Sequence, residues 1–179
     1  MNRAGLFIRL AAQLIDVAIL MVPIFGVAFF VEEIMGVAAS PVEEARQDRI
    51  ATLLAMPFVL GYTAFEVFTA ATPGKMFLRL RIADRDGTPA PRSRLVLRWT
   101  TKYMPQIFAL FEAATAIPAF RALYSLTSWV IFIGCLVVLR KSRLAWHDEW
   151  AGTSVVRLKR AEAGAFEPIL QAPHGEGTD

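Results

Sequence analysis

The chain has few of the side chains on which soluble active sites and metal centres usually rely. It contains one cysteine, Cys135, so no internal disulfide can form, and only two histidines, His147 and His174. We expect Cys135 inside an apolar helix and His174 in a polar tail, which leaves no cluster of metal ligands. The stretch "ATPGKM" lacks the upstream glycine and the Ser or Thr after lysine that a phosphate-binding loop needs. The sequence therefore predicts no enzyme activity, no cofactor and no metal.

Charged residues are few, and the chain contains long apolar runs. Hydrophobic residues make up 55% of the 179 positions. Four runs, at residues 10–31, 50–72, 104–120 and 122–139, each hold at most one charged residue. A bilayer core about 30 Å thick needs about 20 helical residues, so each run is long enough to cross.

These runs predict an all-α membrane protein with a four-helix transmembrane bundle. Only Arg121 separates the last two runs, and one continuous helix would overshoot the bilayer. We expect a tight hairpin at residues 117–121, where Pro118 helps to end the first arm. The predicted helices cover residues 7–31, 50–72, 94–118 and 121–140.

The charges between the runs predict the orientation. Residues 32–49 hold five acids and two arginines, whereas residues 73–103 hold eight basic residues. Basic loops stay on the cytoplasmic side. We therefore expect both termini and residues 73–103 inside and residues 32–49 outside, a pattern that four spans produce and three do not.

The basic stretch predicts a small sheet on the cytoplasmic face. Leu78, Leu80 and Ile82 alternate with arginines, as in a half-buried strand at about 77–83, and a β-branched run suggests a partner at 153–158. The alternative is an amphipathic basic segment on anionic lipid headgroups. A membrane loop explains the basic residues better than nucleic acid does. Residues 1–160 form one predicted domain, followed by a disordered polar tail at 161–179.

The next helix is predicted to meet the phosphate layer. Arg94, Arg98 and Lys102 fall on one face at a spacing of four residues. Trp99 and Tyr103 are expected to act as anchors at the membrane interface.

Acidic groups within the runs are the candidate functional residues. A charge at depth is costly and normally faces the bundle interior with a partner. Asp16 and Glu66 should lie at similar depths in the cytoplasmic third and could meet there, whereas Glu112 should lie nearer the midplane. Such carboxylates could carry a proton or bind a monovalent cation, or an inner-loop arginine could lock them as a structural ion network.

Several separated motifs together resemble the RDD family of bacterial integral membrane proteins. They are Arg9 and Asp16 in the first run, "FEVFTAATPGKMFLRLRIADRDG" in the middle, and "HDEWAGT" from His147. The resemblance covers about residues 5–157 and implies a multi-pass protein of the bacterial cytoplasmic membrane. It also implies monovalent cation/proton antiport, as described for some members, or a scaffold role, as fusions to soluble modules suggest.

These observations combine into one hypothesis about the inner face. Arg9, Asp16, Lys75, Arg81 and Asp148 are predicted to form a charged cluster that holds the basic loop against the helices. The full predicted set comprises Arg9, Asp16, Glu66, Gly74, Lys75, Arg81, Glu112, His147, Asp148 and Gly152. We expect a non-catalytic membrane module that binds a partner or anionic lipid headgroups. The alternative is a cation/proton antiporter, which four helices could form only as a homo-oligomer.

Overall fold

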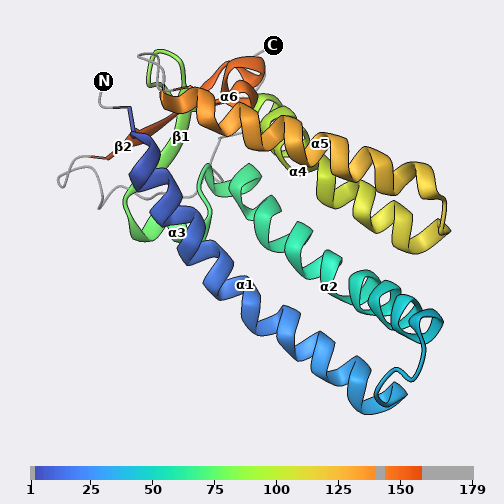
Figure 1. The fold of residues 1–179 in the computed structure, drawn as a ribbon. Coiled ribbons are helices and arrows are strands. Elements are labelled where there is room, and N and C mark those ends of the chain that lie inside the picture. The colour runs from blue at the N-terminus through green and yellow to red at the C-terminus, as the bar shows by residue number, and fades with distance from the viewer. Residues whose placement is uncertain (1–2, 140–143, 159–179) are drawn as a thin grey trace, which may run out of the picture.

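Four long helices make up most of the molecule, arranged as two hairpins (Figure 1). The computed structural model describes residues 3–139 and 144–158, so the predicted tail at 161–179 lies outside the described residues. Helix α1 (Leu6–Met35) pairs with α2 (Pro41–Thr69), and α4 (Arg92–Thr115) pairs with α5 (Pro118–Leu136). The hairpins meet where α2 packs against α4.

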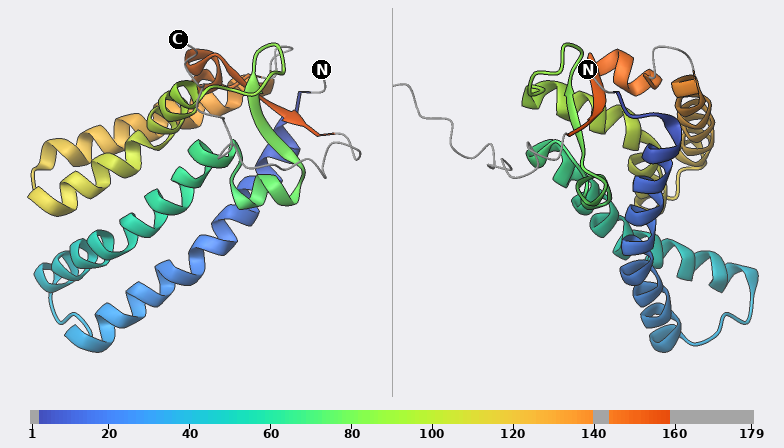
Figure 2. Two further views of the ribbon diagram at one scale, coloured as in Figure 1. Left: turned by 180° about the vertical axis from the view of Figure 1, so that it is seen from behind. Right: turned by 90° about the vertical axis from the view of Figure 1, so that its left-hand side faces the viewer.

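The short elements gather at one end of the helices (Figures 1 and 2). They are α3 (Pro73–Phe77), β1 (Leu80–Asp84), the 3₁₀ turn η1 (Val137–Leu139), α6 (Trp146–Ala151) and β2 (Thr153–Arg157). Strands β1 and β2 pair antiparallel, with Ile82 opposite Val155. The predicted small sheet is therefore confirmed. Its first strand begins at Leu80, because the preceding residues form a helical turn.

A compact apolar core joins the sheet to the helices. Leu80 and Ile82 are fully buried on one face of β1, and they pack with Ala12 of α1, Val67 of α2 and Leu95 of α4. Alternate residues of a strand point to opposite faces. Arg81 therefore points away from this core.

Helix α2 begins at Pro41, nine residues before the predicted start at 50. Ser40 caps this end, because its Oγ accepts a hydrogen bond from the Glu43 amide at 3.3 Å. Proline at the first position and acids in the first turn also favour a helix start. Counting apolar residues alone missed these polar turns, so much of the predicted outer loop is helix.

The α4–α5 hairpin turns at Ala116, whose φ is 57°. Pro118 does not end the first arm, as the sequence suggested, but starts α5 at its first turn. Proline fits that position because the first amides of a helix have no acceptor within it.

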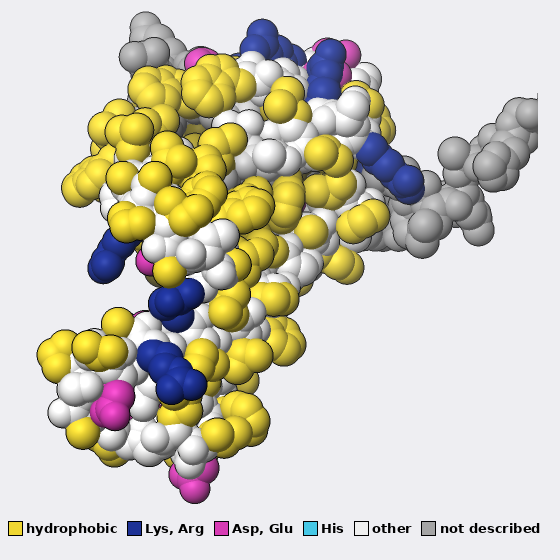
Figure 3. All heavy atoms as spheres, turned by 90° about the vertical axis from the view of Figure 1, so that its right-hand side faces the viewer, with side chains coloured by type: hydrophobic (Ala, Val, Ile, Leu, Met, Phe, Trp, Pro, Cys, Tyr) yellow, Lys and Arg dark blue, Asp and Glu magenta, His cyan; other side chains and the backbone are white. Residues whose placement is uncertain are grey.

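Three segments are long and apolar enough to cross a membrane: α1, α2 and residues 118–139. Among the described helices α4 is long enough but not apolar enough, because its first half carries Arg92, Arg94, Arg98 and Lys102. Large apolar side chains stand exposed along the spans, including Phe7, Phe25, Phe58 and Trp129. Figure 3 shows apolar side chains covering much of the helical surface.

Candidate functional site: a buried charge network

Asp16 of α1 is enclosed by three hydrogen-bond donors. Its carboxylate accepts from the Tyr62 hydroxyl at 2.7 Å, the Thr72 hydroxyl at 2.6 Å and the Gly74 amide at 2.7 Å. The side chain is buried, at 3% exposure. Neutral donors therefore satisfy this carboxylate, whereas the sequence suggested an arginine or a second carboxylate as its partner.

Gly74 makes this contact by a close approach of α3 to α1. A Cβ at this position would lie 2.3 Å from the Ala12 carbonyl oxygen and 2.8 Å from Asp16 Oδ1. Only glycine lets the backbone come this near. The predicted motif residue Gly74 is thus required by sterics.

Glu66 of α2 binds two cations. Its carboxylate accepts from Lys75 Nζ at 2.6 Å and from Arg98 Nη1 at 2.8 Å. Burial lowers the pKa of the Lys75 ammonium; the Glu66 charge opposes this, and the positive charges of Arg98 and Lys102 reinforce it. The net effect lowers the pKa of Lys75 to about 7, so Lys75 depends on its contact with Glu66 to keep a positive charge.

Asp148 of α6 forms the matching pair on the other side. It accepts from Arg9 Nη1 at 2.6 Å and from Arg98 Nε at 2.9 Å. Burial opposes ionisation, but the Arg98 and Arg9 charges outweigh it and hold the pKa of Asp148 well below its usual range. The first motif arginine and the second motif aspartate, far apart in sequence, thus form an ion pair.

Arg98 connects the two carboxylates and is the centre of the network. It is 2% exposed and contacts both Glu66 and Asp148. The prediction that Arg98 faces lipid phosphates is therefore wrong. The i, i+4, i+8 spacing places Arg94, Arg98 and Lys102 on one helix face. Whether a residue of that face is buried or exposed depends on how the helices pack.

His147 lies beside this centre in its neutral form. Burial lowers its pKa to about 3. Its Nε2 lies 3.5 Å from Arg98 Nη2 and 3.5 Å from Asp148 Oδ1. Its Nδ1 is buried with no hydrogen-bond partner among the described residues.

The predicted cluster is formed in part. The structure brings Arg9, Lys75 and Asp148 together and places Asp16 next to them through α3. Arg81 is not a member, because it points to the other face of β1. Its Nε is buried without a partner in the described part of the chain.

Asp16 and Glu66 do not share a proton or a ligand. Gly74 binds the first and Lys75 the second, so adjacent residues of α3 hold carboxylates of two different helices. Tyr62 and Thr72 were missed as Asp16 partners. The only signal available for them was their spacing along α2 and toward α3. That spacing does not identify Asp16 as their partner until the packing of α1 against these elements is known.

The predicted interface anchors are also internal. Trp99 Nε1 donates to Thr63 Oγ1 at 3.1 Å, and Tyr103 is 6% exposed. Lys102 donates to Tyr103 Oη at 2.9 Å and to Gln13 Oε1 at 3.3 Å. Trp99 and Lys102 therefore make contacts within the protein, to α2 and α1 respectively.

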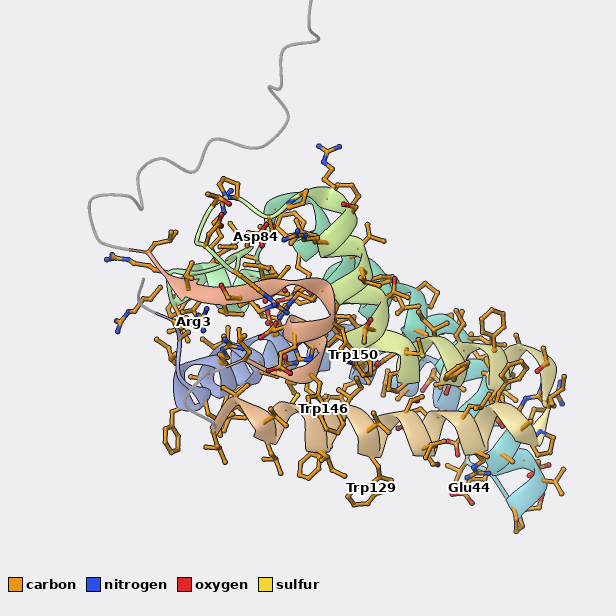
Figure 4. The ribbon with its side chains drawn as sticks, turned by 90° about the horizontal axis from the view of Figure 1, so that it is seen from above. Arg3, Glu44, Asp84, Trp129, Trp146 and Trp150 are labelled. Atoms are coloured by element: carbon orange, nitrogen blue, oxygen red, sulfur yellow. The ribbon has the colours of Figure 1, made fainter. Side chains whose placement is uncertain are left out.

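Gly152 ends α6 in a left-handed conformation, with φ of 68°. The side chain of Arg94 lies beside it and pairs with Asp84 of β1, which Figure 4 labels. On the other side of α6, Trp146 packs against Gly134 of α5. Gly152 therefore has a structural role, because it ends α6 and lies against the Arg94 side chain.

Glu112 lies at the opposite end of the helices. It lines a cavity of 480 Å³ between the hairpins. The other lining residues are Ala45, Asp48, Arg49, Thr52, Met56, Gln106, Ala109, Arg121 and Tyr124. Figure 3 views this end, with basic side chains beside the hollow. Glu112 is thus separate from the buried charge network at the sheet end of the helices.

Comparison with known families agrees with this arrangement. The sequence model of the RDD family matches residues 3–152. The chain belongs to the RDD family. The match spans Arg9, Asp16 and Asp148, so the network of this RDD protein lies within the family domain. Searches of curated proteins and of solved structures each found no match.

The network as a whole binds elements together. Each of its carboxylates, Asp16, Glu66 and Asp148, has at least two donors. Breaking a buried ion pair by removing one partner costs about 3–5 kcal/mol. Among the described residues no group of His, Cys, Asp and Glu could hold a metal ion.

Proposed function

We propose that this RDD family membrane protein is a non-catalytic membrane module. The observation that carries the proposal is the complete pairing of Asp16, Glu66 and Asp148 with donors from four elements, α1, α2, α3 and α4, and from Thr72 just before α3. A carboxylate that shuttles protons or cations must exchange its partners. Exchange at Glu66 or Asp148 would leave buried cations without a counter-charge, and exchange at Asp16 would leave three buried neutral donors unpaired.

The module lies with four helices in the bacterial cytoplasmic membrane and with both termini inside. The antiparallel pairing of α4 with α5 and the return of the chain to the sheet end support an even number of crossings. Arg98 is paired internally with Glu66 and Asp148, and Lys102 is partly buried with hydrogen bonds to Gln13 and Tyr103, so α4 can lie among the other helices.

The exposed inner surface binds anionic lipid headgroups. Arg79, Arg85, Arg92 and Arg157 are exposed at the sheet end, where the neighbouring acids are Asp84, Asp86 and Glu149. Each basic residue near an anionic surface contributes about 1 kcal/mol. The charge network holds the sheet in place, so these arginines keep a fixed orientation toward the membrane surface.

Monovalent cation/proton antiport is the second candidate. The cavity beside Asp48 and Glu112 favours it, because Gln106 Oε1 at this cavity is buried without a partner in the described part of the chain. A cation leaving on the cytoplasmic side would have to pass the buried network, in which Asp16, Glu66 and Asp148 are already paired. An oligomer would be needed to complete a path.

Proton flux in proteoliposomes distinguishes the two candidates. We expect no pH change driven by Na⁺ or K⁺ from folded wild-type protein. A cation-driven pH change that Asp16→Asn abolishes would overturn the module proposal and establish transport. Correct folding is checked by a single symmetric peak in size-exclusion chromatography before reconstitution.

Headgroup binding is tested separately with vesicles. The wild-type chain in detergent should bind phosphatidylglycerol vesicles more tightly than phosphatidylcholine vesicles, and salt should weaken the binding. Replacing Arg79, Arg85, Arg92 and Arg157 by Gln should remove this preference. Equal binding of both lipids by the wild type would refute the surface role.

A further inference from the structure

A cavity of 140 Å³ adjoins the buried network where the inner ends of α1 and α5 meet. Its basic lining residues are Arg9, Lys75, Arg98 and Lys102. His147 also lines it, while Leu6, Leu10 and Val138 supply apolar walls. An apolar cavity of about 150 Å³ holds a benzene-sized molecule, so this space is large enough for a phosphate group.

Lys102 has no carboxylate of its own. Arg9, Lys75 and Arg98 each contact Glu66 or Asp148. Lys102 donates only to the oxygens of Gln13 and Tyr103 within the described range. The nearby Glu66 charge acts favourably on Lys102, but the Glu66 oxygens already contact Lys75 and Arg98, so Lys102 has no direct ionic partner among the described residues.

His147 supplies an unused polar atom in the same lining. Its Nε2 lies 3.5 Å from both the Arg98 guanidinium, which donates, and the Asp148 carboxylate, which accepts, so these contacts do not fix the tautomer. Its Nδ1 is buried and has no partner in residues 3–139 and 144–158. A buried unpaired polar atom is costly, and an anion oxygen beside Nδ1 would satisfy it in the tautomer that carries the hydrogen there.

The position of the cavity favours a lipid as the source of the anion. Arg9 lies one turn into α1, near the inner end of a membrane span. Helix α1 packs mainly along α2 and α3, whereas α5 packs along α4 and α6. The side between α1 and α5 therefore lacks extensive helix packing, and Leu6 and Leu10 could contact acyl chains there.

We propose that this cavity binds the phosphate group of an anionic phospholipid, with Lys102 and His147 as its principal donors. The apolar wall formed by Leu6, Leu10 and Val138 holds the start of an acyl chain. The inference rests on the proposed function only in placing the chain in a membrane with anionic lipid. It concerns an internal site distinct from the exposed arginines.

Native mass spectrometry of the full chain in detergent, with added phosphatidylglycerol, tests the site. We expect one lipid per chain to remain bound at about 1 M salt, where a Debye length of about 3 Å screens surface attraction. Lys102→Gln should weaken binding about tenfold, the scale of one charge-assisted hydrogen bond. Lys102→Arg should restore much of it, and Arg46→Gln, an exposed charge on α2, should leave it unchanged.

A blocking pair checks the location without altering charge. Leu10→Trp should fill the apolar wall and weaken binding, whereas Leu14→Trp, one turn further along α1 and outside the lining, should not. Binding that neither Lys102→Gln nor Leu10→Trp reduces would overturn the proposal. So would equal retention of phosphatidylcholine.

Inorganic phosphate separates the two sources of the anion. If it stabilises the wild type but not Lys102→Gln, and phosphatidylglycerol is not retained, the lipid assignment is wrong and the cavity is a site for free phosphate. Loss of vesicle binding with retention of the salt-resistant lipid would instead refute only the surface role.

Discussion

Gly74 of α3 donates its amide hydrogen to Asp16 of α1 at 2.7 Å, and no side chain could replace its hydrogen without a clash. The next residue, Lys75, binds Glu66 of α2 at 2.6 Å. Two adjacent residues thus attach a five-residue helix to both arms of the first hairpin. This attachment positions β1 against the ends of the helices.

Gly74→Ala should lower the free energy of unfolding by about 3 kcal/mol, because the methyl group forces α3 away from Ala12 and Asp16. The thermal unfolding midpoint in detergent measures the effect. Gly61→Ala provides the matched control, since nothing lies within 4 Å of its Cβ position. Gly61→Ala should be neutral or stabilising by about 1 kcal/mol. Equal effects of the two changes would refute the close approach.

Arg98→Met should cost about 3–5 kcal/mol, because it leaves Glu66 and Asp148 with one cation each in a buried setting. Arg98→Lys should recover part of this loss, since one ammonium cannot span both carboxylates as the guanidinium does. Arg92→Met, at an exposed position of the same helix, should change stability by about 0.5 kcal/mol or less. Chemical unfolding in detergent gives all three values. Tolerance of Arg98→Met would contradict a central role.

Asp16→Asn should destabilise the protein although the two side chains have nearly the same shape. The new amide group must place a donor where Tyr62, Thr72 and Gly74 already donate, which costs about 1–3 kcal/mol. Tyr62→Phe, which removes one of the three donors, should cost less. The same unfolding assay ranks the two variants. Unchanged stability in Asp16→Asn would contradict the arrangement of three donors around this carboxylate.

Acid should weaken the fold through His147. Its pKa is about 3 when folded, and about 6.5 in a model peptide. Between these values the unfolded chain binds a proton that the folded chain excludes, so stability falls as pH falls below about 6.5. At 1.36 kcal/mol per pKa unit, the loss by pH 5 is about 2 kcal/mol.

His147→Asn should flatten this acid limb in thermal unfolding between about pH 7 and pH 5. Asp148 does not disturb this window, because the pKa of its carboxyl lies below its usual range when folded, and that range is about 3.9 when unfolded. Identical pH profiles for the wild type and His147→Asn would show that the folded state accommodates a charged imidazole.

The sequence by itself determined the membrane character, the helical class and the residues of the family motif. Apolar runs and alternating strand residues depend on local chemistry, so residues 7–31 of α1 and the β1–β2 pair could be anticipated. The start of α2 was misplaced because its first turns are polar and capped by Ser40. At this end the Ser40 cap and the proline at the first position favour a helix, although the residues of the first turns are not apolar.

The tertiary structure alone decided which charges meet. Arg98 looked like a surface cation because its helix neighbours are basic, yet the fold covers it with Glu66 and Asp148, which lie 32 and 50 residues away in the chain. Asp16 and Glu66 have similar expected depths, but rotation about each helix axis directs them to different partners. Depth follows from counting residues along a helix. Partnership depends on which faces the helices turn toward one another, and side-chain packing sets those faces.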